Sequence, residues 1–144
     1  MISTVQGIIA LTTEADLLKE MAAFETAADK RIAPIEKLLA VDIRSTEETT
    51  VQNHMTAIDA HRQAAVRIYA LAACFLEHAK SPYFGLATKG TEFERSSKQK
   101  QIIAPFTGMS VRYEGLVRSI DSRVNLCKVL LRVSGDNTTN TNIN

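Results

Sequence analysis

The chain has 144 residues, 45% hydrophobic and 23% charged, which suits one soluble domain with a sizeable core. It has no Trp, six Gly and three Pro, a balance that favours helix over strand. Two cysteines exclude a disulfide framework, and the first residues lack the pattern of a secretion signal or a membrane span. We therefore expect a single helical domain over residues 1–135, a cytoplasmic location and no membrane partner.

Charge is divided unequally along the chain. Residues 1–59 carry ten acids and five bases, whereas residues 60–132 carry twelve bases and five acids, although the net charge is only +1. Such asymmetry can mark a polyanion as a partner. It equally fits acidic and basic helices that attract each other, within one chain or between stacked subunits.

The first predicted helix begins after Thr13 and runs to about Ile43. Thr13 supplies a hydroxyl cap, acids follow in the first turn, and apolar residues recur every three or four positions. Pro34 lies inside this run. Because proline lacks an amide donor and clashes with the preceding turn, the sequence predicts a kink or short break near residues 31–34.

The second predicted helix begins at a capping box formed by Ser45 and Glu48. No Pro or Gly follows before Ala79, so this helix is about 50 Å long. Apolar residues at heptad spacing, widened by neighbouring positions, form a stripe that must be covered on two sides. This is therefore the central helix of the molecule or of an oligomer, and the residues predicted for an oligomer interface are Val51, Met55, Ile58, Arg62, Tyr69 and Leu76, together with Ile120 and Val124 of the last helix.

Arg62 interrupts the apolar stripe and has two interpretations. Its aliphatic stem packs while the guanidinium reaches water, or it forms an ion pair between helices or subunits. Asp29 and Glu25 of the acidic first helix are the candidate partners for such a pair.

The remaining chain predicts a loop, a short helix and a long helix. Residues 80–90 hold Pro and Gly, and Thr91 with Glu94 forms a second capping box for a short helix ending near residue 104. Pro105 can begin the last helix, which extends to about residue 133, and Gly135 is a natural stop. Residues 136–144 form a polar tail. The expected fold is an all-α elongated bundle of two or three long helices plus one short helix, whose thin shape favours a homo-oligomer.

Candidate catalytic and metal-binding residues do not converge. His54 and His61 share a face, and Cys74 and His78 are four apart, but neither pair has a further ligand at a suitable spacing. No phosphate-binding glycine loop, nucleophile elbow or zinc-protease motif is present. We expect a protein that is not an enzyme and that takes no metal, cofactor or small-molecule substrate.

Basic residues interleaved with aromatic residues favour binding of single-stranded nucleic acid, because the charges hold phosphates and the rings stack on bases. The alternative is a solvated face of Lys and Arg, with aromatic side chains closing the loop. The candidate nucleic-acid-binding residues are Lys80, Tyr83, Phe84, Lys89, Arg95, Lys98 and Lys100, with Arg112, Arg123 and Lys128 of the last helix.

The order of parts resembles the phage recombination mediator family typified by UvsY. The segments that carry the resemblance are Lys80–Gly85, "KSPYFG", and the closing "YEGLVRSIDSRVNLCKVLL". The resemblance implies a ring-forming helical protein of the host cytoplasm that binds single-stranded DNA, with Lys80 and its neighbours as contacts, and helps to load a recombinase. The alternatives are a structural protein, such as a virion component, and a small adaptor that binds a partner helix.

Overall fold

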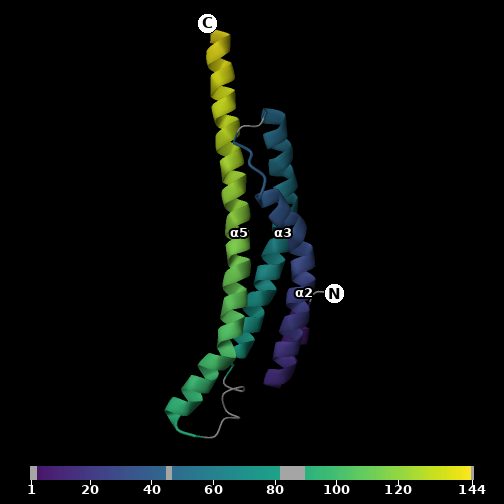
Figure 1. The fold of residues 1–144 in the computed structure, drawn as a ribbon, viewed down its shortest axis with the longest axis vertical. Helices are drawn as coiled ribbons and strands as arrows, with labels where there is room; N and C mark the ends of the chain where they lie inside the picture. Colours follow the sequence, from purple (N-terminus) through teal and green to yellow (C-terminus); the bar gives the residue numbers. More distant parts are fainter. Residues whose placement is uncertain (1–2, 45–46, 82–89, 144) are drawn as a thin grey trace.

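The computed structural model describes residues 3–44, 47–81 and 90–143. These ranges contain four helices and no strand: α1 (Val5–Ile9), α2 (Glu14–Leu39), α3 (Glu48–Ala79) and α5 (Glu92–Ile143). The prediction of an all-α fold is confirmed. Figure 1 shows α2, α3 and α5 side by side along the long axis of the molecule, so the bundle is elongated.

Helix α2 begins as predicted and continues through Pro34. The Thr13 hydroxyl accepts a hydrogen bond from the Asp16 amide at 3.1 Å. An internal proline costs about 3 kcal/mol, but the neighbouring Ile32 and Ile35 are 2% and 0% exposed. Burying each of those side chains contributes about 1.5–3 kcal/mol. Packing therefore outweighs the local penalty, and the predicted break is absent; the helix ends at Leu39 rather than near Ile43.

Helix α3 has the predicted length but a different N-terminal cap. Its cap residue is Glu47, which makes no side-chain hydrogen bond to the first turn. The capping box predicted on Ser45 involves a residue outside the described part of the chain, and the described helix begins at Glu48 with Glu47 before it. The helix depends on its buried face rather than on a cap.

Helix α5 is one helix where the sequence predicted two. Thr91 caps it as expected, since its hydroxyl and the Glu94 carboxylate each accept an amide hydrogen bond at 3.2 Å. The helix does not end near residue 104, because Ile102 and Phe106, on either side of Pro105, are both buried. Figure 1 shows the first turns leaning away from the rest of α5, as expected where a proline removes a backbone hydrogen bond.

The predicted stop at Gly135 is also wrong, since the backbone remains helical to Ile143. Glycine permits left-handed backbone at a helix end but does not impose it. The segment 136–143, predicted as an irregular tail, continues α5 past the start of α3 (Figure 1).

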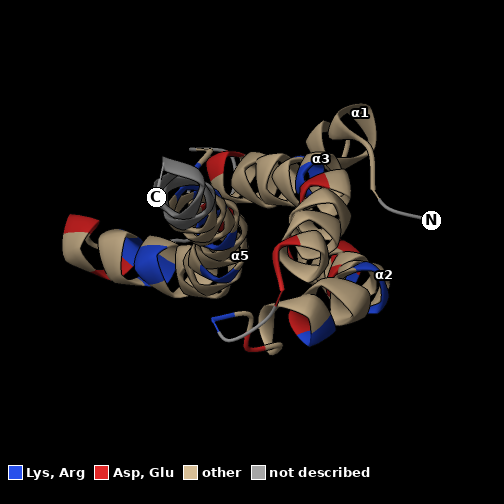
Figure 2. Ribbon diagram, turned by 90° about the horizontal axis from the view of Figure 1, so that it is seen from above, with Lys and Arg blue, Asp and Glu red and all other residues tan. Residues whose placement is uncertain are grey.

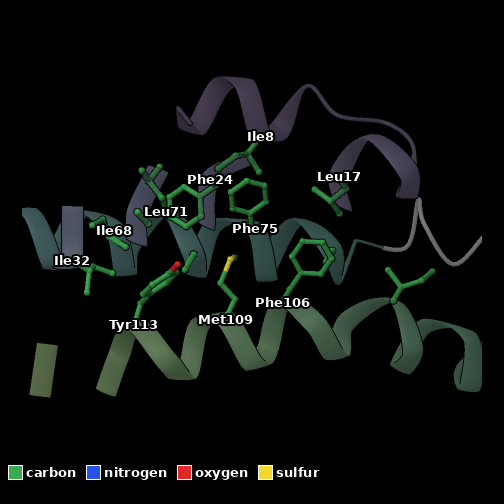
Figure 3. Packing of buried hydrophobic residues seen from close by; sticks show 14 residues of the cluster. Ile8, Leu17, Phe24, Ile32, Ile68, Leu71, Phe75, Phe106, Met109 and Tyr113 are labelled. Atoms are coloured by element: carbon green, nitrogen blue, oxygen red, sulfur yellow. The ribbon is translucent and has the colours of Figure 1, made fainter. Parts of the chain in front are cut away.

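Helix α1 was not predicted as an element, although it completes the core. Thr4 caps it, and Ile8 is fully buried. Figure 3 shows Ile8 above Phe24 and Phe75, while Phe106 and Tyr113 approach from α5. The Phe24 ring meets the Tyr113 ring edge-on, with centroids 5.9 Å apart. Aromatic packing therefore joins α2, α3 and α5 at one end of the bundle, and Ile8 adds α1 to the same cluster.

The heptad stripe of α3 is covered within the single chain. Val51 is 3% exposed, and Ile58 and the α5 residue Ile120 are fully buried. The half-buried residues of the predicted interface pack against these core clusters: Met55, Tyr69, Leu76 and Val124. Helices α2 and α5 supply the two covering surfaces, so this stripe does not require a second copy of the chain to cover it. The oligomeric state itself stays a prediction.

Candidate nucleic-acid interface

The predicted basic residues fall into two groups. Lys80 is the C-cap of α3. Arg95, Lys98 and Lys100 lie on the first turns of α5, a segment that we call the basic arm (residues 92–101). Arg112, Arg123 and Lys128 lie farther along α5. The remaining predicted residues, Tyr83, Phe84 and Lys89, lie outside the described residues.

Arg112 binds the acidic helix α2. Its guanidinium Nη2 lies 2.8 Å from Oδ1 of Asp29, and the guanidinium carbon lies 5.3 Å from the centre of the Tyr113 ring. The Tyr113 hydroxyl donates a long hydrogen bond of 3.5 Å to the same carboxylate. Burial, reinforced by the charge of Asp29, raises the pKa of Tyr113 to about 12. Arg112 is thus committed to a carboxylate of its own chain.

Arg123 holds the end of α2. Its Nη2 donates to the Leu39 carbonyl at 2.6 Å, and its Nη1 donates to the Val41 carbonyl. Basic groups at a helix C-terminus satisfy the last carbonyls and complement the helix dipole. Nη1 also lies 3.4 Å from Nε2 of His54. Burial, and secondly the charge of Arg123, lowers the pKa of His54.

Arg62 forms an ion pair between helices, the second of its two interpretations, but with a different partner. Its Nε lies 2.7 Å from Oδ1 of Asp121 on α5. The hydrogen bond from Arg62 lowers the pKa of Asp121. The predicted partners Asp29 and Glu25 are therefore wrong, since Asp29 pairs with Arg112 instead.

The basic arm keeps its side chains in solvent. Phe93, an aromatic residue next to the basic residues in the sequence, is 80% exposed. Arg95 and Lys100 are exposed and form no ion pair with any described residue. Lys98 lies 3.9 Å from Glu14, at the limit of an ion pair. Figure 2 shows the arm extending sideways from the bundle, with basic residues behind an acidic first turn.

One contact ties the arm to the end of α3. The Gln99 side chain donates to the Lys80 carbonyl at 3.2 Å, and Lys80 itself lies 3.3 Å from Glu77. Lys128 is exposed, but 28 residues of helix place it about 40 Å from Lys100. The structure therefore gathers Lys80, Arg95, Lys98 and Lys100 at one end and leaves Lys128 apart.

Potential metal ligands stay dispersed over the described part of the chain. No three His, Cys, Asp or Glu side chains in the described ranges come together as ligands. Burial raises the pKa of both Cys74 and Cys127, so their thiols are poor nucleophiles. None of the helices in the described part of the chain is sufficiently long and apolar to cross a bilayer.

Comparison of the chain with protein-family models, with curated protein sequences and with solved structures found no match. The resemblance to recombination mediators accordingly stays a prediction.

Proposed function

We propose that the protein is a non-catalytic accessory protein whose basic arm binds single-stranded nucleic acid. One observation carries the proposal: the exposed Phe93 lies on the same projecting segment as Arg95 and Lys100, which have no acidic partner among the described residues. An exposed ring stacks on a base, and adjacent cations hold the backbone phosphates. Single strands suit this arrangement better than a duplex, whose bases are already stacked.

Binding at one arm is expected to be weak and insensitive to sequence. Base–aromatic stacking contributes about 1–3 kcal/mol per base, and Glu92 and Glu94 offset part of the positive charge of the arm. Arg112 and Arg123 do not add positive charge to the basic arm, because both guanidinium groups bind groups of the same chain. The affinity should fall steeply with salt, because each phosphate contact releases counterions.

Fluorescence anisotropy with a labelled single-stranded oligonucleotide at low and moderate salt tests this function. We expect the parent protein to bind at low salt. In the double variant Arg95→Ala with Lys100→Ala, the slope of the logarithm of the binding constant against the logarithm of the salt concentration should become shallower by about 1.4, or ~0.7 per lost phosphate contact. Phe93→Ala should weaken binding about tenfold while leaving the salt slope unchanged, since it removes stacking but no charge. Lys128→Ala is the matched control, because Lys128 is exposed on the same helix but far from the arm.

A structural or adaptor role is the second candidate, and the internal ion pairs favour it. Arg112 with Asp29 and Lys98 with Glu14 join the basic α5 to the acidic α2. Charge asymmetry along the sequence then serves the fold rather than a polyanion. A parent protein that does not bind the oligonucleotide even at low salt would favour this role, and it would also remove the reason to propose a recombinase as partner.

A further inference from the structure

A groove of about 610 Å³ runs along the outer side of α3, next to α2. Arg31 lines it from α2, and six residues of α3 line the rest, including Ala60, Gln63, Val66 and Arg67. This side of α3 faces away from the buried residues Ile58, Ala65 and Ile68. Helices α2 and α5 therefore leave it uncovered. Its alanines are small, so the backbone of another helix can approach closely.

The exposed face around this groove carries both signs of charge. Asp59 and Arg67 are exposed, and neither forms an ion pair with any described residue. Val66 is also 37% exposed, although it is a large hydrophobic residue. With Arg31 of α2 at its edge, the face carries one acid and two bases around small and apolar residues, which suits a partner helix that also carries both charges.

The residues of this face are arranged symmetrically about Gln63. Asp59 lies four positions before it and Arg67 four after, while Ala60 lies three before and Val66 three after. Positions three and four apart share a helix face. If a second α3 lies antiparallel with a two-fold axis at Gln63, each Asp59 meets Arg67 of the other copy and each Ala60 meets Val66. The face is therefore complementary to itself.

We propose that this face of α3 binds a second copy of the chain, antiparallel and two-fold symmetric about Gln63. Such isologous contacts are the commonest way in which identical chains pair. The Gln63 amides lie on the axis, where each can donate to and accept from the other. A foreign acidic helix would place its acids against Asp59, and a basic one would face Arg67 and Arg31, so a second copy fits better than either.

The proposed contact is small, so the dimer should be weak. From Thr56 to Ala70 the overlapping segment spans about 21 Å of helix, which places the interface at the low end of specific contacts, about 1,200 Å² in total or less. Dimerisation does not rest on nucleic-acid binding, although it would join two basic arms in one particle and raise their combined affinity.

Sedimentation equilibrium over a wide range of protein concentration tests the proposal. The parent is compared with variants in which the charges at positions 59 and 67 are reversed. We expect the parent to dimerise reversibly, and Arg67→Glu or Asp59→Arg alone to raise the dissociation constant at least tenfold, because each sets like charges opposite one another. The double variant Asp59→Arg with Arg67→Glu restores both pairs and should return the constant to within about threefold of the parent. Lys128→Glu, an exposed change on α5, should leave it unaltered. Circular dichroism verifies that every variant remains helical.

Disulfide trapping tests the position of the axis. Gln63→Cys places a thiol on the axis of the dimer, so air oxidation should trap a covalent dimer on non-reducing gels. Thr56→Cys is the matched control, because that position faces Ala70 of the other copy and lies about 21 Å from its own counterpart. The proposal is overturned by a parent that stays monomeric at every concentration, by a double variant that remains dissociated, or by equal trapping of the two cysteine variants.

Discussion

Arg123 of α5 donates a hydrogen bond of 2.6 Å to the carbonyl of Leu39, 84 positions earlier in the chain. The same guanidinium binds the Val41 carbonyl, so one α5 side chain closes the end of α2. Arg123 was predicted from the sequence to bind phosphate. In the structure it instead holds the basic helix α5 against the end of the acidic helix α2.

Arg123→Ala should lower the free energy of unfolding by about 2 kcal/mol, the range for hydrogen bonds made by a charged donor. Arg123→Lys should recover only part of this, because an ammonium cannot span both carbonyls as the guanidinium does. Urea unfolding followed by circular dichroism measures both variants. Lys128→Ala should stay within about 0.5 kcal/mol of the parent; an equal loss in that control would mean that α5 tolerates alanine poorly everywhere.

The ion pair between Arg62 and Asp121 should stabilise the fold at neutral pH and fail in acid. Because Arg62 lowers the pKa of Asp121 in the folded state, the unfolded chain takes up a proton first as the pH falls. The stabilisation is complete above the ordinary pKa of the carboxyl, 3.8, and is lost as the pH falls through the lowered value. The free energy of unfolding of Asp121→Asn should therefore fall less steeply than that of the parent as the pH drops below about 3.8. In an Arg62→Ala background the same substitution should have no such effect, and an unchanged effect there would exclude Arg62 as the cause.

His54 should make the protein less stable as the pH falls below about 6.5. Burial and Arg123 lower its pKa in the folded state, so below the ordinary value of 6.5 the unfolded chain binds the proton more readily. The contribution of neutral His54 is present above pH 6.5 and is lost as the pH falls through the lowered pKa. His54→Gln should be less sensitive than the parent to a change from pH 7 to pH 5 in urea unfolding. If His61→Gln, on the same helix, reduces the sensitivity equally, the effect does not belong to the buried site.

Gly108→Ala and Gly115→Ala should each stabilise the chain by about 1 kcal/mol. Both glycines lie within α5, and a methyl group added at either would contact nothing within 4 Å. Alanine is the better helix former because glycine loses more backbone entropy on folding. Thermal unfolding of the single and double variants measures the gain. A loss of stability at either position would show that another chain packs closely against this face of α5.

The amino-acid sequence by itself determined where most helices lie. The three- and four-residue spacing of apolar positions, the Thr13 and Thr91 caps and the uninterrupted run to Ala79 are local signals, and local signals define helices well. They also gave the all-α class and the width of the α3 stripe. Helix α1 was not predicted, because five residues are too few to show the periodicity of a helix. Only the burial of Ile8 in the folded structure shows where α1 packs.

Only the tertiary structure decided whether a helix continues through a residue that disfavours it. Pro34 and Pro105 each carry a local penalty, but the buried residues that flank them, such as Ile32 and Phe106, stabilise the helix by more. The size of that gain depends on which surface lies opposite, and no sequence pattern specifies the opposite surface.

The partners of the charged residues were decided in the same way. The sequence identified Arg62 as a candidate for an ion pair between helices, but the choice of Asp121 over Asp29 depends on how α3 and α5 lie along each other. Likewise, the apolar stripe of α3 showed how much surface had to be covered. Whether the same chain or another copy covers it is decided by packing between segments distant in sequence, and here α2 and α5 cover the stripe while the face around Gln63 stays open.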